Sequence, residues 1–471
     1  MKFKISIVLL LTFFLTTNCD TKDDLEVPQA LQINDFVWKG MNLYYLWQNE
    51  VPNLQDTQFS NQDQLNNFLS GYSNPINLFN VLRVPTTLDR FSVIFDNYNN
   101  LEGILSGNTL NNGVDFALKY KTGSSTELFG YVRYIIPNSD ASAKNIQRGD
   151  LFYAVNGIPI TVSNYQELLA NTNYTLNLAD FDNGNITPNG TSVALTKTNL
   201  SENPVLISNV INEGNHKIGY LVYNGFYPGY ESQLNNAFSQ LKNQQITDLV
   251  LDLRYNSGGS IATATRLASM ITGQFNGQLF AKEQWNSKLQ AYWNDVNPTQ
   301  LVNNFTNKIG NGNPISSLNE TKIYILTSKS TASASELIIN GLKPYINVIQ
   351  IGDVTTGKNV GSITLYDSPS FKKYNASSKH KYAMQPIVFK TVNKAGFGDY
   401  QQGLQPNFTI IEDLGNLGIL GNPEEPLLSE AIAQILANGK KSEAKSTTTF
   451  QDFKNAKEMN SLQSEMYTEF K

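Results

Sequence analysis

The spacing of hydrophobic positions changes along the chain, and each change predicts a region of different architecture. From Leu31 to about Leu69, apolar residues recur every three or four positions, which is typical of amphipathic helices. Pro52 and an Asn/Gln-rich stretch after it interrupt this pattern. We therefore predict a small helical N-terminal domain over residues 28–98, with its aromatic side chains in the core.

A second pattern follows, in which short apolar runs replace the helical spacing. The runs at 114–118 and 130–136 contain residues that suit the pleated surface of a strand. Residues 139–160 then combine a short helix, a Gly-Asp turn, a strand and the pair Asn156-Gly157. Because Asn-Gly is a strong signal for a two-residue hairpin, a further strand is expected after it.

This order of elements resembles a PDZ domain over residues 100–200, with a second helix expected from Tyr165 to Ala170. A PDZ domain binds an extended peptide by adding it to a sheet, and it holds the terminal carboxylate on backbone N–H groups. The resemblance implies that Gly113, Val114 and Phe116 take part in peptide binding. An unrelated small β domain is the alternative.

In the third pattern, over residues 205–437, buried strands alternate with helices. The strand at 248–253 is apolar nearly throughout, as in a sheet that is covered on both faces. We predict an α/β core here, so the chain as a whole is an α/β multidomain protein, α+β overall. Residues 438–471 form a polar tail, which we expect either to contain a helix near Asn455 to Met466 or to lack order.

The N-terminus has the features of an export signal. Two lysines precede an apolar run from Ile5 to Leu15, which is too short to span a bilayer and typical of a signal peptide. Cys19 follows, which resembles a bacterial lipoprotein signal over 1–18 with a tether over 19–27. The resemblance implies lipidation of Cys19 and a place on the outer membrane, on its periplasmic side or at the cell surface. A stray cysteine near an ordinary cleavage site is the alternative.

Composition limits the chemistry of the protein. The 471 residues include one cysteine and two histidines, which excludes an intramolecular disulfide and a cysteine-rich metal site. The net charge of −5 gives no electrostatic footprint for nucleic acid. We therefore expect no metal and no cofactor, and any catalysis to rest on hydroxyls, carboxylates or lysine.

Two motifs in the α/β region carry this chemistry. Residues 252–259 lead from the buried strand into a Gly-Gly turn, whose exposed N–H groups can stabilise an oxyanion. Residues 327–336 end a strand and open a helix, so a serine there lies at the positive end of the helix dipole. Lys358 follows Ser333 by 25 residues.

These motifs resemble the C-terminal processing (tail-specific) proteases of peptidase family S41, which join a PDZ domain to a core of the crotonase and Clp-protease type. The resemblance covers roughly residues 100–435, where the landmarks come in the family's order: the PDZ-like region, 252–259, 332–336, 357–358 and 403–407.

The resemblance implies a nucleophile at Ser333 and a general base at Lys358. The oxyanion would be held by the N–H groups of Gly259 and Ala334. Lysine acts as a base near neutral pH only if burial lowers its pKa. Many relatives have glutamine four residues after the lysine to orient it, whereas this chain has Ser362, which we keep as a candidate orienter.

The sequence therefore predicts an exported serine endopeptidase that cuts unfolded or tail-exposed proteins, which it binds through their C-termini. A catalytically decayed, peptide-binding lipoprotein is the alternative, and the Ser362 departure motivates it. The oligomeric state is left open. Residues 352–358 spell most of a phosphate-binding loop, but Asn359 stands where a serine or threonine is needed, which argues against nucleotide binding.

Overall fold

The computed structural model describes residues 27–182, 184–436, 450–459, 462 and 464–469. Cys19 and the predicted signal peptide lie outside these residues. No helix in the described part of the chain has the length and apolar character that crossing a membrane requires.

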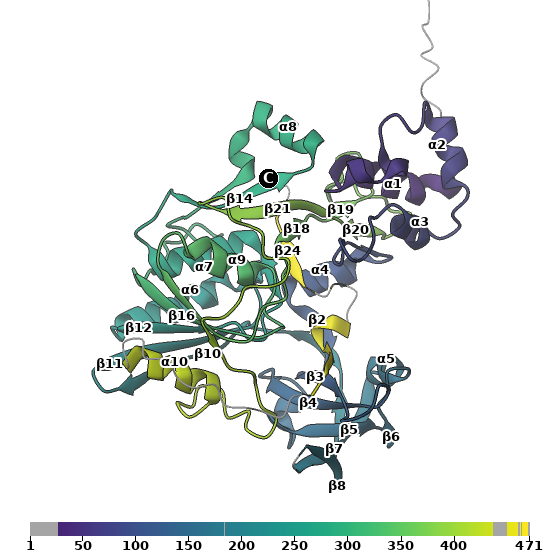
Figure 1. Cartoon of the computed structure of the whole chain (residues 1–471). Helices are drawn as coiled ribbons and strands as arrows, with labels where there is room; N and C mark the ends of the chain where they lie inside the picture. Colours follow the sequence, from purple (N-terminus) through teal and green to yellow (C-terminus); the bar gives the residue numbers. More distant parts are fainter. Residues whose placement is uncertain (1–26, 183, 437–449, 460–461, 463, 470–471) are drawn as a thin grey trace, which may run out of the picture.

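The N-terminal region is built from α1 (Gln32–Tyr44), α2 (Gln62–Leu69) and α3 (Pro75–Val81), at the upper right of Figure 1. The side chains of Asn61 and Asn74 accept hydrogen bonds from the first turns of α2 and α3, as N-cap residues do. One face of α1, including Phe36 and Met41, is buried. The predicted small helical N-terminal region is therefore confirmed.

The second region, at the lower right of Figure 1, is an antiparallel sheet in the order β23-β3-β4-β5-β7-β8, with β6 paired to β5. Its elements are β3 (Val114–Tyr120), β4 (Leu128–Ile135), β5 (Leu151–Val155), β6 (Ile158–Pro159), β7 (Asn173–Asp182), β8 (Asn185–Thr196) and β23 (Asp452–Asn455). Helix α5 (Tyr165–Ala170) packs on one face of the sheet. Asn156 and Gly157 both have positive φ and connect β5 to β6, which confirms the predicted hairpin.

The α/β core contains a sheet in the order β10-β11-β12-β16-β17-β22. Helices α6 (Glu231–Asn243), α7 (Ile261–Thr272) and α9 (Ala334–Leu342) pack on one face and α10 (Pro426–Leu436) on the other (Figure 1). The strands are β10 (Val205–Glu213), β11 (His216–Tyr223), β12 (Asp248–Asp252), β16 (Lys322–Thr327), β17 (Asn347–Gly352) and β22 (Phe408–Thr409). The mixed α/β fold is as predicted, while the assignments to PDZ and crotonase types stay predictions.

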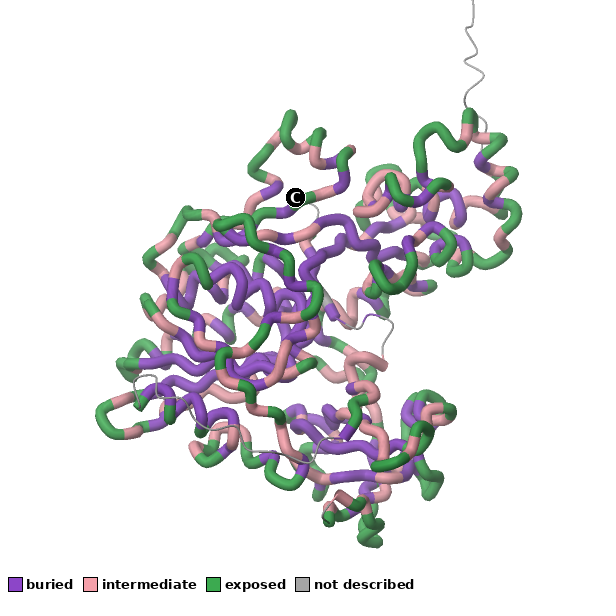
Figure 2. Tube along the Cα trace, viewed as in Figure 1, coloured by how far each residue is buried: buried purple, intermediate pink, exposed green. Residues whose placement is uncertain are grey.

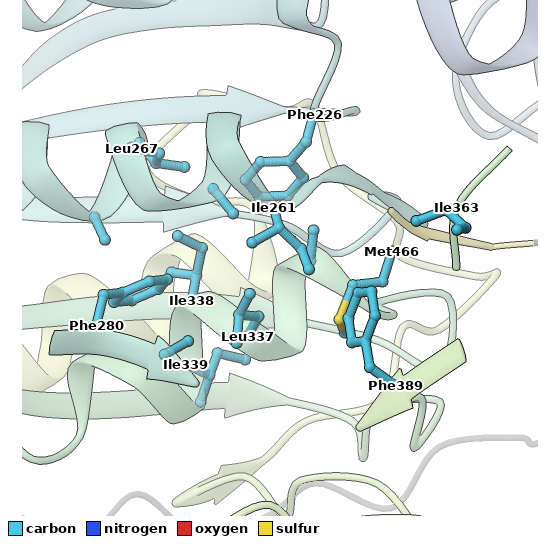
Figure 3. Packing of buried hydrophobic residues seen from close by; sticks show 14 of the residues in the cluster. Phe226, Ile261, Leu267, Phe280, Leu337, Ile338, Ile339, Ile363, Phe389 and Met466 are labelled. Carbon is cyan, nitrogen blue, oxygen red and sulfur yellow. The ribbon is translucent and has the colours of Figure 1, made fainter. Parts of the chain in front are cut away.

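Buried residues are densest in this core, as the purple tube in Figure 2 shows. Figure 3 shows the packing between α7 and α9, where Ile261, Leu337 and Ile338 meet. Because strand residues alternate between the two faces, Leu249 and Leu251 contact this cluster while Val250 faces α10.

A second sheet lies beside the core in the order β13-β24-β18-β21-β14-β15. Its strands are β13 (Gly258–Ser260), β24 (Glu465–Tyr467), β18 (Val360–Ser362), β21 (Ile387–Asn393), β14 (Leu279–Trp285) and β15 (Val302–Asn304), with α8 (Ser287–Val296) after β14. Smaller pairings join β1 (Val93–Phe95), β20 (Ala383–Gln385) and β19 (Leu365–Tyr366), and also β2 (Asn108–Asn111) and β9 (Thr198–Ser201), with α4 (Tyr98–Ser106) between β1 and β2.

The prediction of a helix near Asn455 to Met466 is wrong. The described parts of this tail form β23, a short 3-10 turn (Lys457–Met459) and β24. Phe453, Leu462 and Met466 pack into three different hydrophobic clusters, so they do not share one helical face. Strand partners far away in the sequence determine the conformation instead.

Candidate active site

Ser333 lies in a strained turn between β16 and α9. Its φ of +66° and ψ of −116° are rare for a residue with a side chain and cost about 1–3 kcal/mol. The residue is fully buried, and its hydroxyl has no hydrogen-bond partner among the described residues. Such strain and such an unpaired buried hydroxyl are common at functional sites, where the surrounding structure holds them in place.

The Gly-Gly turn lies directly beside the start of α9. Gly259 has φ of +139°, and a Cβ atom there would come within 2.4 Å of the carbonyl oxygen of Phe226. Only glycine fits this position, because of both its φ and the lack of space. The side chain of Asn256 accepts a hydrogen bond from the N–H of Gly258 at 2.9 Å, which fixes the turn.

Asn256 also joins the Gly-Gly turn to the segment that carries Ser333. Its carbonyl oxygen accepts hydrogen bonds from the N–H of Ala332 and the hydroxyl of Ser335, both at 3.1 Å. Strand β13 and helix α9 are in contact as a result. Gly259 and Ala334, the predicted oxyanion donors, therefore belong to two segments that one residue holds together.

Glu336 connects Ser333 to Lys358. One oxygen of its carboxylate accepts hydrogen bonds from the N–H of Ser333 at 2.7 Å and of Lys358 at 2.8 Å. The other oxygen accepts from the N–H of Gly357 at 2.7 Å and from the hydroxyl of Thr355. Burial raises the pKa of Glu336, although these hydrogen bonds act in the opposite direction.

Lys358 is buried, with 1% of its surface exposed. Its Nζ atom lies 4.6 Å from the centre of the Phe91 ring and donates a hydrogen bond to the carbonyl oxygen of Ser464 at 2.7 Å. Gly357 before it has φ of +85°, and a Cβ there would lie 2.2 Å from the Gln401 carbonyl oxygen. The turn that presents Lys358 therefore requires glycine.

Ser362, the candidate orienter, lies on β18. Its hydroxyl donates to the carbonyl oxygen of Met466 at 3.2 Å and accepts from the side-chain amide of Gln385 at 3.0 Å. The structure thus brings a buried glutamine next to the position where the sequence has serine. Gln385 was not among the predicted site residues, although it is a polar residue inside the otherwise apolar stretch 383–389.

In the predicted peptide-binding loop, Gly113 has φ of +95° and precedes the first residue of β3. The N–H groups of Gly113 and Val114 donate to the side chains of Asn111 and Asn112, at 2.8 and 3.1 Å. These N–H groups are therefore already paired in this structure. Phe116 is buried, and its carbonyl oxygen accepts from the N–H of Ala456 at 2.9 Å.

The two histidines each contact an aspartate, and neither contact includes Ser333 or Lys358. His216 pairs with Asp248 at 2.7 Å and His380 with Asp367 at 2.8 Å. In the described ranges, no group of three His, Cys, Asp or Glu side chains is placed to hold a metal ion. The sequence after Lys358 continues into β18 rather than into the helix that a phosphate-binding loop opens.

Two protein-family models match parts of this chain. Residues 217–384 match the model of peptidase family S41. The model of the S41 N-terminal domain matches residues 32–93, which include α1, α2 and α3. Ser333 and Lys358 both lie inside the S41 match.

Curated relatives include C-terminal processing proteases. A carboxyl-terminal-processing protease of Picosynechococcus sp. is 24% identical over 229 residues, which are 48% of this chain and 50% of that protein. A chloroplastic C-terminal processing peptidase of Tetradesmus obliquus is 23% identical over 260 residues, 53% of this chain and 51% of that protein. The chain thus spans about half the length of these S41 homologues.

The fold has a counterpart among solved structures. A Bacteroides fragilis protein assigned to the S41 proteases superposes with a TM-score of 0.66 at 24% identity, over 86% of this chain and 98% of that one. At this identity the likeness shows a shared fold.

Proposed function

We propose that the protein is a serine endopeptidase of the C-terminal processing type, with Ser333 as nucleophile and Lys358 as general base. The observation that supports this proposal most is that one carboxylate oxygen of Glu336 accepts hydrogen bonds from the backbone N–H groups of both residues. One rigid acceptor therefore sets the relative position of the two segments. The unpaired, buried hydroxyl of Ser333 further supports its role as nucleophile.

In the proposed reaction, neutral Lys358 accepts the proton of the Ser333 hydroxyl as the oxygen attacks a peptide carbonyl. The N–H groups of Gly259 and Ala334 bind the oxyanion of the tetrahedral intermediate. Collapse of the intermediate breaks the C–N bond, and the protonated lysine gives its proton to the leaving amine. Water then attacks the resulting ester by the same route and releases Ser333.

The second region serves as a PDZ domain that binds the substrate's C-terminal part along β3, with Gly113, Val114 and Phe116 at the end of the groove. Its antiparallel sheet, α5 and the Asn156-Gly157 hairpin support this role. Substrates are unfolded or tail-exposed proteins. The protein is exported and lipid-anchored through Cys19, which the N-terminal sequence supports. Radiolabelled palmitate should label the wild type and not Cys19→Ser.

The test of the reaction is hydrolysis of an unstructured protein by wild type, Ser333→Ala and Lys358→Met, with cleavage products identified by mass spectrometry. Each of these two variants should reduce kcat/KM by at least about 10³-fold. Ser232→Ala and Lys242→Met, at exposed positions of α6, are matched controls and should keep the wild-type rate. Undiminished hydrolysis by Ser333→Ala would refute the proposal.

A catalytically decayed, peptide-binding protein is the competing function. Ser333, Lys358 and the Gly-Gly turn are all present and connected through Glu336 and Asn256, which argues against decay. A fluorophosphonate probe distinguishes the two functions, because it should label the wild type at Ser333 and label Lys358→Met far more slowly.

A further inference from the structure

The C-terminal segment, defined as residues 450–459, 462 and 464–469, passes through the candidate active site. Its strand β24 lies between β13 and β18 and pairs in parallel with both. Strand β13 contains Gly259, and β18 begins two residues after Lys358. Without β24, these two strands would face each other with unpaired edges, which is the arrangement that an extended peptide can fill.

The same segment contacts Lys358 directly. The Nζ atom of Lys358 donates to the carbonyl oxygen of Ser464, while the Ser333 hydroxyl has no partner among the described residues. The proposed base is therefore bonded to the segment's backbone rather than to the proposed nucleophile. In this arrangement the proton transfer that begins the proposed reaction has no hydrogen bond along which to occur.

Met466 fixes the segment at this place. Its side chain is fully buried and lies against Phe389, near Ile363 (Figure 3). Ser362 donates to the carbonyl oxygen of Met466, and the N–H of Thr468 donates to the carbonyl oxygen of Ser362 at 3.2 Å. An apolar side chain and a two-sided backbone pairing are what a peptide substrate in a strand-binding site would offer.

The upstream part of the segment is bound to the second region. Strand β23 pairs with β3 in antiparallel fashion and runs toward the loop at Gly113. Phe453 inserts between Tyr120 of β3 and Tyr165 of α5, with ring centres 5.4 and 5.0 Å away. The segment thus occupies the groove in which the proposed PDZ domain would bind a substrate.

Between the β3/α5 groove and the β13/β18 gap, the C-terminal segment lies over the loop that leads to Ser333. A cavity of about 160 Å³ is lined by Ser257 and Ala332 on the site side and by Asn455, Lys457 and Ser464 of the segment. Lys457 reaches the carbonyl oxygens of Asn224 at 2.7 Å and Tyr255 at 3.2 Å, beside the Gly-Gly turn. The segment therefore closes the site from the groove to Lys358.

We propose that the C-terminal segment is a built-in inhibitor, which binds as a substrate-like strand in both the β3/α5 groove and the β13/β18 gap. This inference rests on the proposed function and adds its regulation. A substrate binds at the active site only by displacing the C-terminal segment. Extended chains that place an apolar residue where Met466 lies therefore compete best with the segment for the β13/β18 gap. An intramolecular ligand acts at an effective concentration on the order of 1 mM. If the isolated segment binds with a Kd of ~0.1 mM, about ten of eleven molecules are closed.

The experiment compares the full chain with a chain that stops after residue 436, and with two full-length variants, Met466→Glu and Phe453→Ala. Hydrolysis of an unstructured protein and labelling of Ser333 by a fluorophosphonate are measured for each, with circular dichroism melting as the check of folding. The truncated chain and Met466→Glu should be about tenfold faster than the full chain in both assays. Phe453→Ala should show a smaller increase.

Binding is measured separately from catalysis. A fluorescent peptide of residues 450–469 is titrated into the truncated Ser333→Ala protein, with the Met466→Glu peptide as matched control. The wild-type peptide should bind with a Kd of roughly 0.1 mM and inhibit the active truncated chain competitively, and the control peptide should do neither. If no protein hydrolyses substrate but the peptide binds, the proposed function fails and the inference of an occupied site stands. If the full-length variants fold and react at the wild-type rate, or the peptide does not bind, the inhibitor proposal is refuted whatever the truncated chain does.

Discussion

Two glutamates, the buried Glu336 in the candidate active site and the partly buried Glu412 between the core and the second region, differ in the groups that hold them. Burial acts to raise the pKa of both carboxyls. The pKa of Glu336 stays above its ordinary value, because its partners are neutral N–H and O–H groups. The pKa of Glu412 falls to about 2, because the guanidinium groups of Arg148 and Arg254 outweigh burial.

The difference matches what each carboxylate connects. Arg148 comes from the loop before β5 and Arg254 from the end of β12, so Glu412 joins two regions through charge. Glu336 joins the segments of Ser333 and Lys358 through neutral donors, which are backbone N–H groups and the hydroxyl of Thr355. Neutral donors position a site without placing a cation beside the proposed base, whereas a cation there would disfavour protonation of Lys358, because like charges repel.

The largest effect is expected from Glu336→Ala. The substitution leaves three buried N–H groups without their acceptor, each at about 1–3 kcal/mol, and releases the strained turn at Ser333. We expect kcat/KM to fall by about 10²–10³-fold and the free energy of unfolding to fall by about 3–5 kcal/mol. Hydrolysis of an unstructured protein and urea unfolding measure the two quantities.

Glu430→Ala is the matched control, since Glu430 is also a buried helical glutamate but contacts Gln434 on α10. It should lower stability modestly and leave kcat/KM of the folded fraction unchanged. An equal loss of activity in both variants would show that Glu336 acts only through global stability.

Glu412→Gln should affect stability more than activity. A pKa held at about 2 instead of 4.5 corresponds to roughly 3 kcal/mol, at about 1.4 kcal/mol per factor of ten in acidity. Since the folded pKa is lowered, this contribution is present above pH 4.5 and is lost as the pH falls toward 2. We expect urea unfolding at pH 7 to show a loss of about 3 kcal/mol, with kcat/KM within about threefold of wild type. A variant whose acid unfolding profile still follows the wild type would contradict this role.

The local patterns in the sequence predicted the α/β core well. The strand at 248–253 and the helices after it depend on hydrophobic spacing, which neighbouring residues specify. The hairpin at Asn156-Gly157 depends on a dihedral preference of those residues alone. Ser333, Lys358 and Gly259 came from ordered motifs, and their roles stay proposals.

The C-terminal segment could not be predicted in the same way. Strand β24 has three residues, too few for a period, and its partner Gly258 lies about two hundred positions earlier in the chain. Phe453 and Met466 stood out only as isolated apolar residues in a polar tail. Such residues bury in places that the tertiary structure provides, which no local pattern encodes.

Glu336 was visible in the motif, but its role was not. Position 336 suits a residue that shapes the first turn of a helix, and its contact with Ser333 fits that interpretation. Its contacts with Thr355, Gly357 and Lys358 require β16 and β17 to be adjacent in the sheet. The local role of Glu336 at the start of the helix can thus be predicted from the sequence, whereas its contacts with the Lys358 segment depend on the topology of the sheet.

The smallest effect is expected at Glu320, whose carboxylate has neither an arginine partner nor a set of backbone donors among the described residues. Burial and then the negative charge of Asp248 raise its pKa to about 7, against the opposing effect of Lys322. Since the folded pKa is raised, its contribution to stability is complete below pH 4.5 and is lost as the pH rises through about 7.

Glu320→Gln should therefore flatten the dependence of the urea midpoint on pH between 5 and 8.5. The effect should stay below about 1 kcal/mol because the side chain is only partly buried, and kcat/KM should not change. His216 also contacts Asp248, so the same curve is measured for the exposed control Glu424→Gln, which keeps this contact and Glu320 unchanged. If the control and Glu320→Gln follow one curve, burial does not raise the pKa of Glu320, and the explanation given for Glu336, which depends on the same effect, fails with it.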